Sequence, residues 1–220
     1  MRIIEVTGSV ADFHDRQIPD DLTEAEVWLF RPAQRSLVLG SSQDESTART
    51  AAAAAAGVSV VRRRSGGGAV YVDPLRCLWL DVVLPRSDAR WSEDVRASAY
   101  WLGEAWMRAL RAADFDASLY EGGLEKTTWG RLVCFAALGP GEVLVEGRKA
   151  VGISQRRTRA GARFQCIVYD HWDPWDVLDL VDLDPDDQHR AAAELADVAV
   201  GVGGRLDAVR EAILQELLGG

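Results

Sequence analysis

Apolar and polar positions alternate along much of the chain in a pattern that predicts strands. Short runs rich in β-branched and aromatic residues are bounded by Pro, Gly and Ser. These runs are residues 2–6, 26–30, 36–39, 58–61, 69–72, 78–84, 142–146, 149–155 and 164–169. The glycine-containing turns after residue 142 predict that the last three runs form a meander.

Other segments have the spacing of helices. Apolar residues recur at helical intervals across residues 92–113, and Ser92 is a candidate N-cap. The alanine-rich residues 47–56 end at Gly57, a typical helix stop. Residues 189–200 and 206–218 follow an acidic stretch and also have helical spacing. The pattern thus predicts a chain of mixed strands and helices, without internal repeats.

Composition indicates one soluble domain. The chain has 220 residues, of which 48% are hydrophobic, enough for one core. No run approaches the roughly 18 to 20 apolar residues of a membrane span, and the N-terminus lacks the layout of a secretory signal. We therefore expect a cytoplasmic protein that has no membrane partner.

Cysteine and histidine usage does not indicate a metal site. Cys77, Cys134 and Cys166 are widely spaced and do not form a paired motif, so we expect free thiols. His14, His171 and His189 lack metal-protease spacing and lie in polar surroundings. We expect these histidines at the surface.

The net charge of −9 argues against a nucleic acid partner, which would require many basic residues on one face. The basic residues gather instead in residues 62–64 and 148–163. Such stretches suit a small anionic ligand or an acidic protein partner. Solvated, arginine-rich strand edges are an equally good interpretation from charge alone.

A glycine triplet, Gly66 to Gly68, follows one predicted strand and precedes another. Backbone N–H groups in such a loop can closely approach phosphate or carboxylate oxygens. The triplet matches neither the P-loop nor the dinucleotide-binding fingerprint, because no Gly-Lys-Ser/Thr and no helix follow it. On the glycines alone, a β-bulge or turn is the simpler interpretation.

The surrounding residues change that interpretation. The run RRRSGGGAVY at residues 62–71 closely resembles the signature of lipoate-protein ligases and octanoyltransferases, which share a catalytic domain with biotin ligases. The run EGRKAVGISQRR at residues 146–157 is similar to the lysine motif of that family, and LGSSQ at residues 39–43 to its first loop. The likeness covers most of residues 1–175. Residues 176–220 are expected to form a helical segment on the same domain.

This resemblance implies an α+β fold of two layers, in which mixed or antiparallel sheets pack against helices. It also implies which residues bind the acyl or acyl-adenylate ligand. These residues are Arg63, Ser65, Gly66, Gly67, Gly68, Ala69, Val70, Tyr71, Gly152 and Ser154, with Lys149 at the polar junction of the ligand.

Strand alternation predicts that Lys149 shares a face with Val151 and Ile153, beside an apolar wall. An eight-carbon chain on that wall would gain about 0.8 kcal/mol per methylene, while the ammonium contacts its polar end. A lysine that reaches into water from a hairpin edge is the alternative.

Cys134 precedes the lysine motif at a spacing that resembles the octanoyltransferases that carry the acyl group on a cysteine. A nearby positive charge would stabilise its thiolate. A buried apolar cysteine is the alternative. The chain departs from the family where Val72 and Cys166 stand in place of two usual histidines, which puts substrate choice and full activity in question.

Three functions remain open. The first is a ligase that uses lipoate and ATP with Mg²⁺ to attach an acyl group to a lysine of a lipoyl-type carrier domain, either alone or together with a separate accessory subunit. The second is an ATP-independent octanoyltransferase that accepts octanoate from acyl carrier protein onto Cys134. The third is a catalytically reduced acyl-binding protein. The first is favoured, because both motifs support an acyl-adenylate and the Cys134 route depends on one residue.

Overall fold

A computed structural model describes residues 1–219. Its main element is a seven-stranded mixed sheet with the order β1-β2-β6-β10-β9-β8-β7. The strands are β1 (Arg2–Gly8), β2 (Glu26–Pro32), β6 (Cys77–Pro85), β7 (Ala117–Leu119), β8 (Val143–Val145), β9 (Arg148–Arg157) and β10 (Gly161–Tyr169). Only the β1–β2 pair is parallel among these neighbours.

A smaller sheet has the order β4-β3-β5. Its strands are β3 (Ser36–Leu39), β4 (Ser59–Arg62) and β5 (Val70–Val72). The α-helices are α1 (Val10–Asp15), α2 (Thr50–Ala55), α3 (Tyr100–Ala112), α4 (Trp175–Leu178), α5 (Pro185–Leu195) and α6 (Leu206–Gly219), and the short 3-10 helices are η1 (Glu45–Thr47), η2 (Ala97–Ala99) and η3 (Cys134–Ala136).

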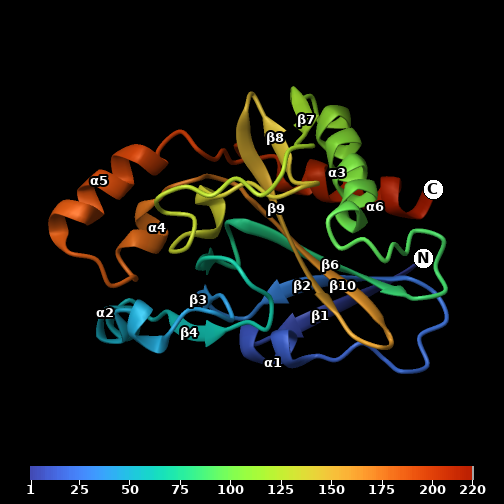
Figure 1. Cartoon of the computed structure of the whole chain (residues 1–220), viewed down its shortest axis with the longest axis horizontal. Helices are drawn as coiled ribbons and strands as arrows, with labels where there is room; N and C mark the ends of the chain where they lie inside the picture. The colour runs from blue at the N-terminus through green and yellow to red at the C-terminus, as the bar shows by residue number, and fades with distance from the viewer. Residues whose placement is uncertain (220) are drawn as a thin grey trace.

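The large sheet separates two hydrophobic cores. Helices α3 and α6 pack against each other on one face, while α1 and the small sheet lie on the other side (Figure 1). Alternate residues of β6 illustrate the division, since Leu80 joins the core under the helices and Trp79 joins the core under the small sheet. The expected α+β fold, with a mixed sheet packed on helices, is confirmed. Among residues 1–219, no helix combines the length and apolarity that a membrane span requires.

Two predicted helices are shorter than expected. The segment before α3 forms turns, because the Asp94 carboxylate accepts hydrogen bonds from the backbone N–H groups of Arg96 and Ala97. Ser92 therefore does not cap the helix, which becomes regular only at Tyr100. The alanine-rich helix starts at Thr50, because Ala48 forms a β-bridge with Val181.

The apolar pattern missed the short elements, including α1, β7 and α4. Helix α1 begins directly after β1, where Ser9 caps it by accepting the backbone N–H of Asp12. It spans only six residues, fewer than two turns, so no periodicity could reveal it. This helix nevertheless contributes a residue to the pocket described next.

Candidate active site

An apolar pocket lies between the two sheets. Strands β3 and β5 of the small sheet supply Val38 and Val70, and the large sheet supplies residues of β6, β9 and β10. The predicted site residues that line it are Arg63, Val70, Cys134, Gly152 and Ser154. The lining of the pocket is mostly apolar with a few polar side chains, which is the usual composition of a small-molecule site.

The glycine triplet is where three segments of backbone cross. A Cβ atom on Gly68 would lie 2.6 Å from the carbonyl carbon of Val133, and one on Gly40 would lie 1.8 Å from the carbonyl oxygen of Gly67. Gly67 has a positive φ of 98°. Only glycine permits such close approach, so the motif allows the LGSSQ loop and the segment before η3 to meet.

Hydrogen bonds fix this crossing. The Ala69 N–H donates to the carbonyl of Leu132 at 2.7 Å, and the Cys134 N–H donates to the carbonyl of Ala69 at 2.9 Å. The Gln43 side-chain amide donates to the Leu132 carbonyl at 3.1 Å. The predicted glycine motif and the predicted Cys134 are thus brought together, although they are distant in sequence.

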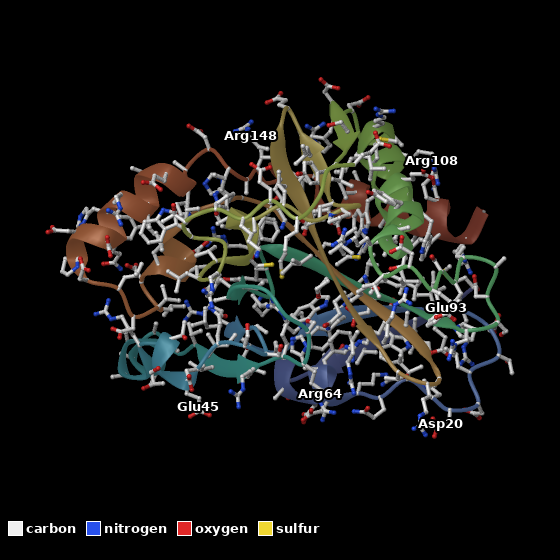
Figure 2. The ribbon with its side chains drawn as sticks, viewed as in Figure 1. Asp20, Glu45, Arg64, Glu93, Arg108 and Arg148 are labelled. Atoms are coloured by element: carbon white, nitrogen blue, oxygen red, sulfur yellow. The ribbon has the colours of Figure 1, made fainter. Side chains whose placement is uncertain are left out.

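The three neighbouring arginines have different environments. Arg63 is buried and its guanidinium donates to the carbonyls of Gly66 and Gly68 at 2.8 and 2.9 Å. Arg64 points outward beside α1 (Figure 2), where it pairs with Asp15 at 2.9 Å. Arg62 is exposed. Arg63 therefore braces the glycine loop, and its neighbours form a solvated basic edge.

A β-bulge reverses the predicted orientation of Lys149. Val143 of β8 pairs with Val151 and Leu144 pairs with Lys149, so Ala150 is an extra residue in β9. Ala150 and Val151 both enter the core under the helices, while the Lys149 ammonium lies 5.1 Å from the centre of the Phe135 ring on the opposite side. The prediction that Lys149 shares a face with Val151 and Ile153 is wrong, because simple alternation cannot anticipate a bulge.

The Lys149 ammonium is buried and has three oxygen partners. It pairs with Glu142 at 2.7 Å and donates to the carbonyls of Cys134 at 3.2 Å and Ala137 at 2.8 Å. The Glu142 carboxylate also accepts the backbone N–H groups of Gly139 and Ile153. The lysine therefore ties η3, which contains Cys134, to the lysine hairpin. Sequence reasoning missed Glu142, whose only signal was its position at the start of a predicted strand facing Lys149.

The remaining predicted residues lie around the pocket without lining it. The Ser65 hydroxyl lies 3.3 Å from that of Ser154, and the Tyr71 carbonyl accepts the Tyr169 hydroxyl at 2.7 Å. Gly66 is exposed. Cys166 does line the pocket, but it is buried in the core under the helices, and burial raises the pKa of its thiol. Cys134, which is half-buried in the pocket wall, is therefore the more accessible thiol of the two.

His14 of α1 lines the same pocket, and the expectation of a surface residue is wrong. Its side chain is only 6% exposed. His14 is buried because Arg163 of β10 holds α1 against the large sheet. The Arg163 guanidinium donates to the carbonyls of Phe13 and Arg16 and pairs with the buried Asp81 of β6. His171 and His189 are exposed, as expected.

In residues 1–219, no group of three or more His, Cys, Asp or Glu side chains could hold a metal ion.

The buried environment of His14 predicts an acid-sensitive stability. Burial, together with the positive charges of Arg163 and Arg63, lowers the pKa of His14 to about 3. The unfolded chain therefore binds this proton more readily, and stability is lost as the pH falls from about 6.5 towards 3. In His14→Gln, the loss of unfolding free energy between pH 7 and pH 3 should be smaller by up to about 4 kcal/mol. Urea unfolding at several pH values measures this, with exposed His189→Gln as control; parallel curves for wild type and His14→Gln would contradict it.

The glycine crossing predicts a second effect. Gly68→Ala places a methyl group within 2.8 Å of the Cys134 backbone nitrogen, so the segment before η3 must move. We expect a stability loss of about 1–3 kcal/mol. Gly66→Ala is the matched control, because a Cβ there meets no atom within 4 Å. Thermal unfolding of both variants measures the effect, and equal midpoints for the two would refute the role of the crossing.

Comparison with known proteins supports the motif resemblance. A family model described as the lipoyl protein ligase A/B catalytic domain matches residues 14–198. Comparison with curated proteins finds no match. Among solved structures, a bipartite lipoate protein ligase from Thermoplasma acidophilum superposes with a TM-score of 0.74 and 19% identity, over 99% of this chain and 81% of that chain.

Two further structures share the fold. A lipoate-protein ligase A bound with ATP has a TM-score of 0.67 and 19% identity, over 99% of this chain and 84% of that chain. The P. falciparum protein LipL1 in complex with lipoate has a TM-score of 0.64 and 13% identity, over 99% of this chain and 61% of that chain. These likenesses support the fold, and the family model spans most of the sequence. The chain therefore belongs to the lipoyl protein ligase A/B catalytic domain family, enzymes of the ligase and transferase kind.

Proposed function

We propose that this protein transfers a lipoyl or octanoyl group to a lysine of a lipoyl-type carrier domain, with Cys134 as the acyl carrier. The observation that supports this most is the position of Cys134 in the wall of the apolar pocket, beside Gly67 of the glycine motif. An acyl chain in the pocket would place its carbonyl end at this thiol.

The proposed reaction has two steps. The Cys134 thiolate attacks the carbonyl carbon of a donor thioester, such as an acyl group on acyl carrier protein. A new C–S bond forms, the bond to the donor sulfur breaks, and the donor thiolate takes up a proton. The acceptor lysine amine then attacks the Cys134 thioester, an amide bond forms, and the departing Cys134 thiolate takes up the amine proton.

Lys149 has a positioning role in this scheme. Its ammonium holds the carbonyl oxygens of Cys134 and Ala137, at either end of η3, and is itself held by Glu142. Because all three partners are oxygens within 3.2 Å, the backbone that carries the thiol is fixed against the lysine hairpin. Such preorganisation favours attack on a bound carbonyl.

A ligase that uses lipoate and ATP with Mg²⁺ is the second candidate. It is supported by the family model and by relatives described with ATP or lipoate. In that reaction, the lipoate carboxylate displaces pyrophosphate from ATP, and the acceptor lysine then displaces AMP from the acyl-adenylate. One relative is described as bipartite, which supports an accessory subunit for this candidate.

Intact-mass analysis of an apo lipoyl domain separates these proposals. The domain is incubated with the protein and either octanoyl acyl carrier protein without nucleotide or lipoate with MgATP. We expect a mass gain from the carrier alone, accompanied by an acyl adduct on the protein itself. A gain only with MgATP would support the ligase. No gain with either donor, combined with retained binding of octanoate or lipoate, would support an acyl-binding protein.

A further inference from the structure

The two ends of the pocket differ in chemistry. Cys134 lies at one end of the pocket, and its carbonyl accepts a hydrogen bond from the Lys149 ammonium. Ser154 lies five residues further along β9, roughly 16 Å from Lys149 at the rise of a strand, and pairs with Gln165 of β10. Gln165 lies opposite Asp81 of β6, beneath α1. An acyl chain with its carbonyl at Cys134 therefore extends towards Gln165 and His14.

His14 at this far end has one ring nitrogen without a partner. Its Nδ1 lies 3.3 Å from the Gln165 amide nitrogen, whereas its Nε2 is buried and has no hydrogen-bond partner in residues 1–219. The ring also lies 5.1 Å from the Trp79 ring, so apolar surface covers the rest of it. An unpaired buried polar group costs stability, so such a group beside a pocket indicates a hydrogen-bond partner that arrives with the ligand.

The surrounding network assigns the proton of the imidazole. The Gln165 side-chain nitrogen also donates to Asp81 at 3.3 Å, and its oxygen accepts the Ser65 hydroxyl at 3.4 Å. The amide is thereby oriented with its nitrogen towards His14, and an amide nitrogen can only donate. His14 Nδ1 must therefore accept, and the proton of the neutral ring is on Nε2.

We propose that His14 is a specificity-determining residue that donates from Nε2 to an acceptor near the distal end of the acyl chain. This rests on the proposed acyl-transfer function and deepens it. The pocket then prefers an acyl group with sulfur or oxygen near its tail, such as the dithiolane of lipoyl, over an unsubstituted octanoyl chain. The octanoyl tail would leave the buried donor unpaired, whereas a sulfur is a weak acceptor and an oxygen a stronger one.

Binding of neutral acyl compounds tests the preference without catalysis. Calorimetric titration compares lipoamide, 6-hydroxyoctanamide and octanamide on the wild type, His14→Phe and His14→Gln. Wild type should bind lipoamide or 6-hydroxyoctanamide at least about fivefold more tightly than octanamide. A difference of this size is expected when a ligand leaves a buried donor without its hydrogen-bond partner. His14→Phe should bring the ratio of the three affinities close to one, while His14→Gln, which retains an N–H donor, should keep part of the preference.

The outcomes separate this proposal from the proposed function. If all three compounds bind and the affinity ratios are the same in wild type and His14→Phe, His14 is a structural residue and the inference is overturned, while acyl transfer stands. If none of the compounds binds to folded wild-type protein, the acyl pocket itself is refuted together with the proposed function. Circular dichroism of each variant confirms that it is folded before titration. If His14→Phe fails to fold, the wild-type affinities decide, because equal binding of the three compounds overturns the inference.

Discussion

Replacing Lys149 with methionine is expected to lower the free energy of unfolding by about 3–5 kcal/mol and to reduce acyl transfer at least about 100-fold. The substitution leaves the buried Glu142 carboxylate without its cation, and removes both bonds to the carbonyls of Cys134 and Ala137. A buried charge without its partner is more costly than the pair itself. Urea unfolding and single-turnover transfer measure the two effects.

A double variant separates charge from positioning. Glu142→Gln combined with Lys149→Met removes both charges, so much of the lost stability should return. Transfer should remain low, because nothing then holds the carbonyls of η3. If the double variant regains transfer along with stability, the role of Lys149 in positioning Cys134 is refuted, and its effect is one of stability alone.

Much of the fold was predictable because it depends on local apolar patterns. Strands such as β3 and β6 were predicted almost to their ends, since each is rich in apolar residues and buried on both faces, with Asp81 as the one charged residue of β6. Helix α6 followed from its spacing, whereas α5 ends at Leu195 and begins four residues before the predicted helix, because Asp184 caps it ahead of Pro185. The turns before α3 were not predictable in this way, because the carboxylate of a single residue, Asp94, decided where the regular helix could begin.

The site was predictable in its residues and much less so in its geometry. The two motifs identified Arg63 and Lys149, but their contacts depend on tertiary structure, namely a backbone crossing at Gly68 and a bulge at Ala150. His14 gave no usable signal, because α1 is too short for periodicity and its burial depends on Arg163, far away in sequence. Sequence patterns thus indicate which residues serve a site, while long-range contacts decide where their side chains lie.

Cys134→Ala is expected to reduce transfer from a carrier-bound thioester by at least about 1,000-fold, with almost no effect on stability. The backbone bonds of residue 134, to Ala69 and Lys149, do not involve the thiol, so the variant keeps the crossing and η3 in place. Cys77→Ala is the matched control, because the Cys77 thiol donates to the Asp73 carbonyl and burial raises the pKa of that thiol to about 12. Cys77 should therefore form no acyl adduct, and its loss should leave transfer unchanged.

Transfer from lipoate and MgATP provides a second test of Cys134. If the enzyme is a transferase, Cys134→Ala also loses the acyl adduct detected by intact mass. The other thiol of the pocket is that of Cys166, and it cannot replace Cys134 because burial under the helices raises its pKa. If transfer from lipoate and MgATP is present in wild type and survives in Cys134→Ala, the chemistry passes through an acyl-adenylate. The thiol would then be part of the pocket wall, and the proposed thioester route would be wrong even though the acyl pocket stands.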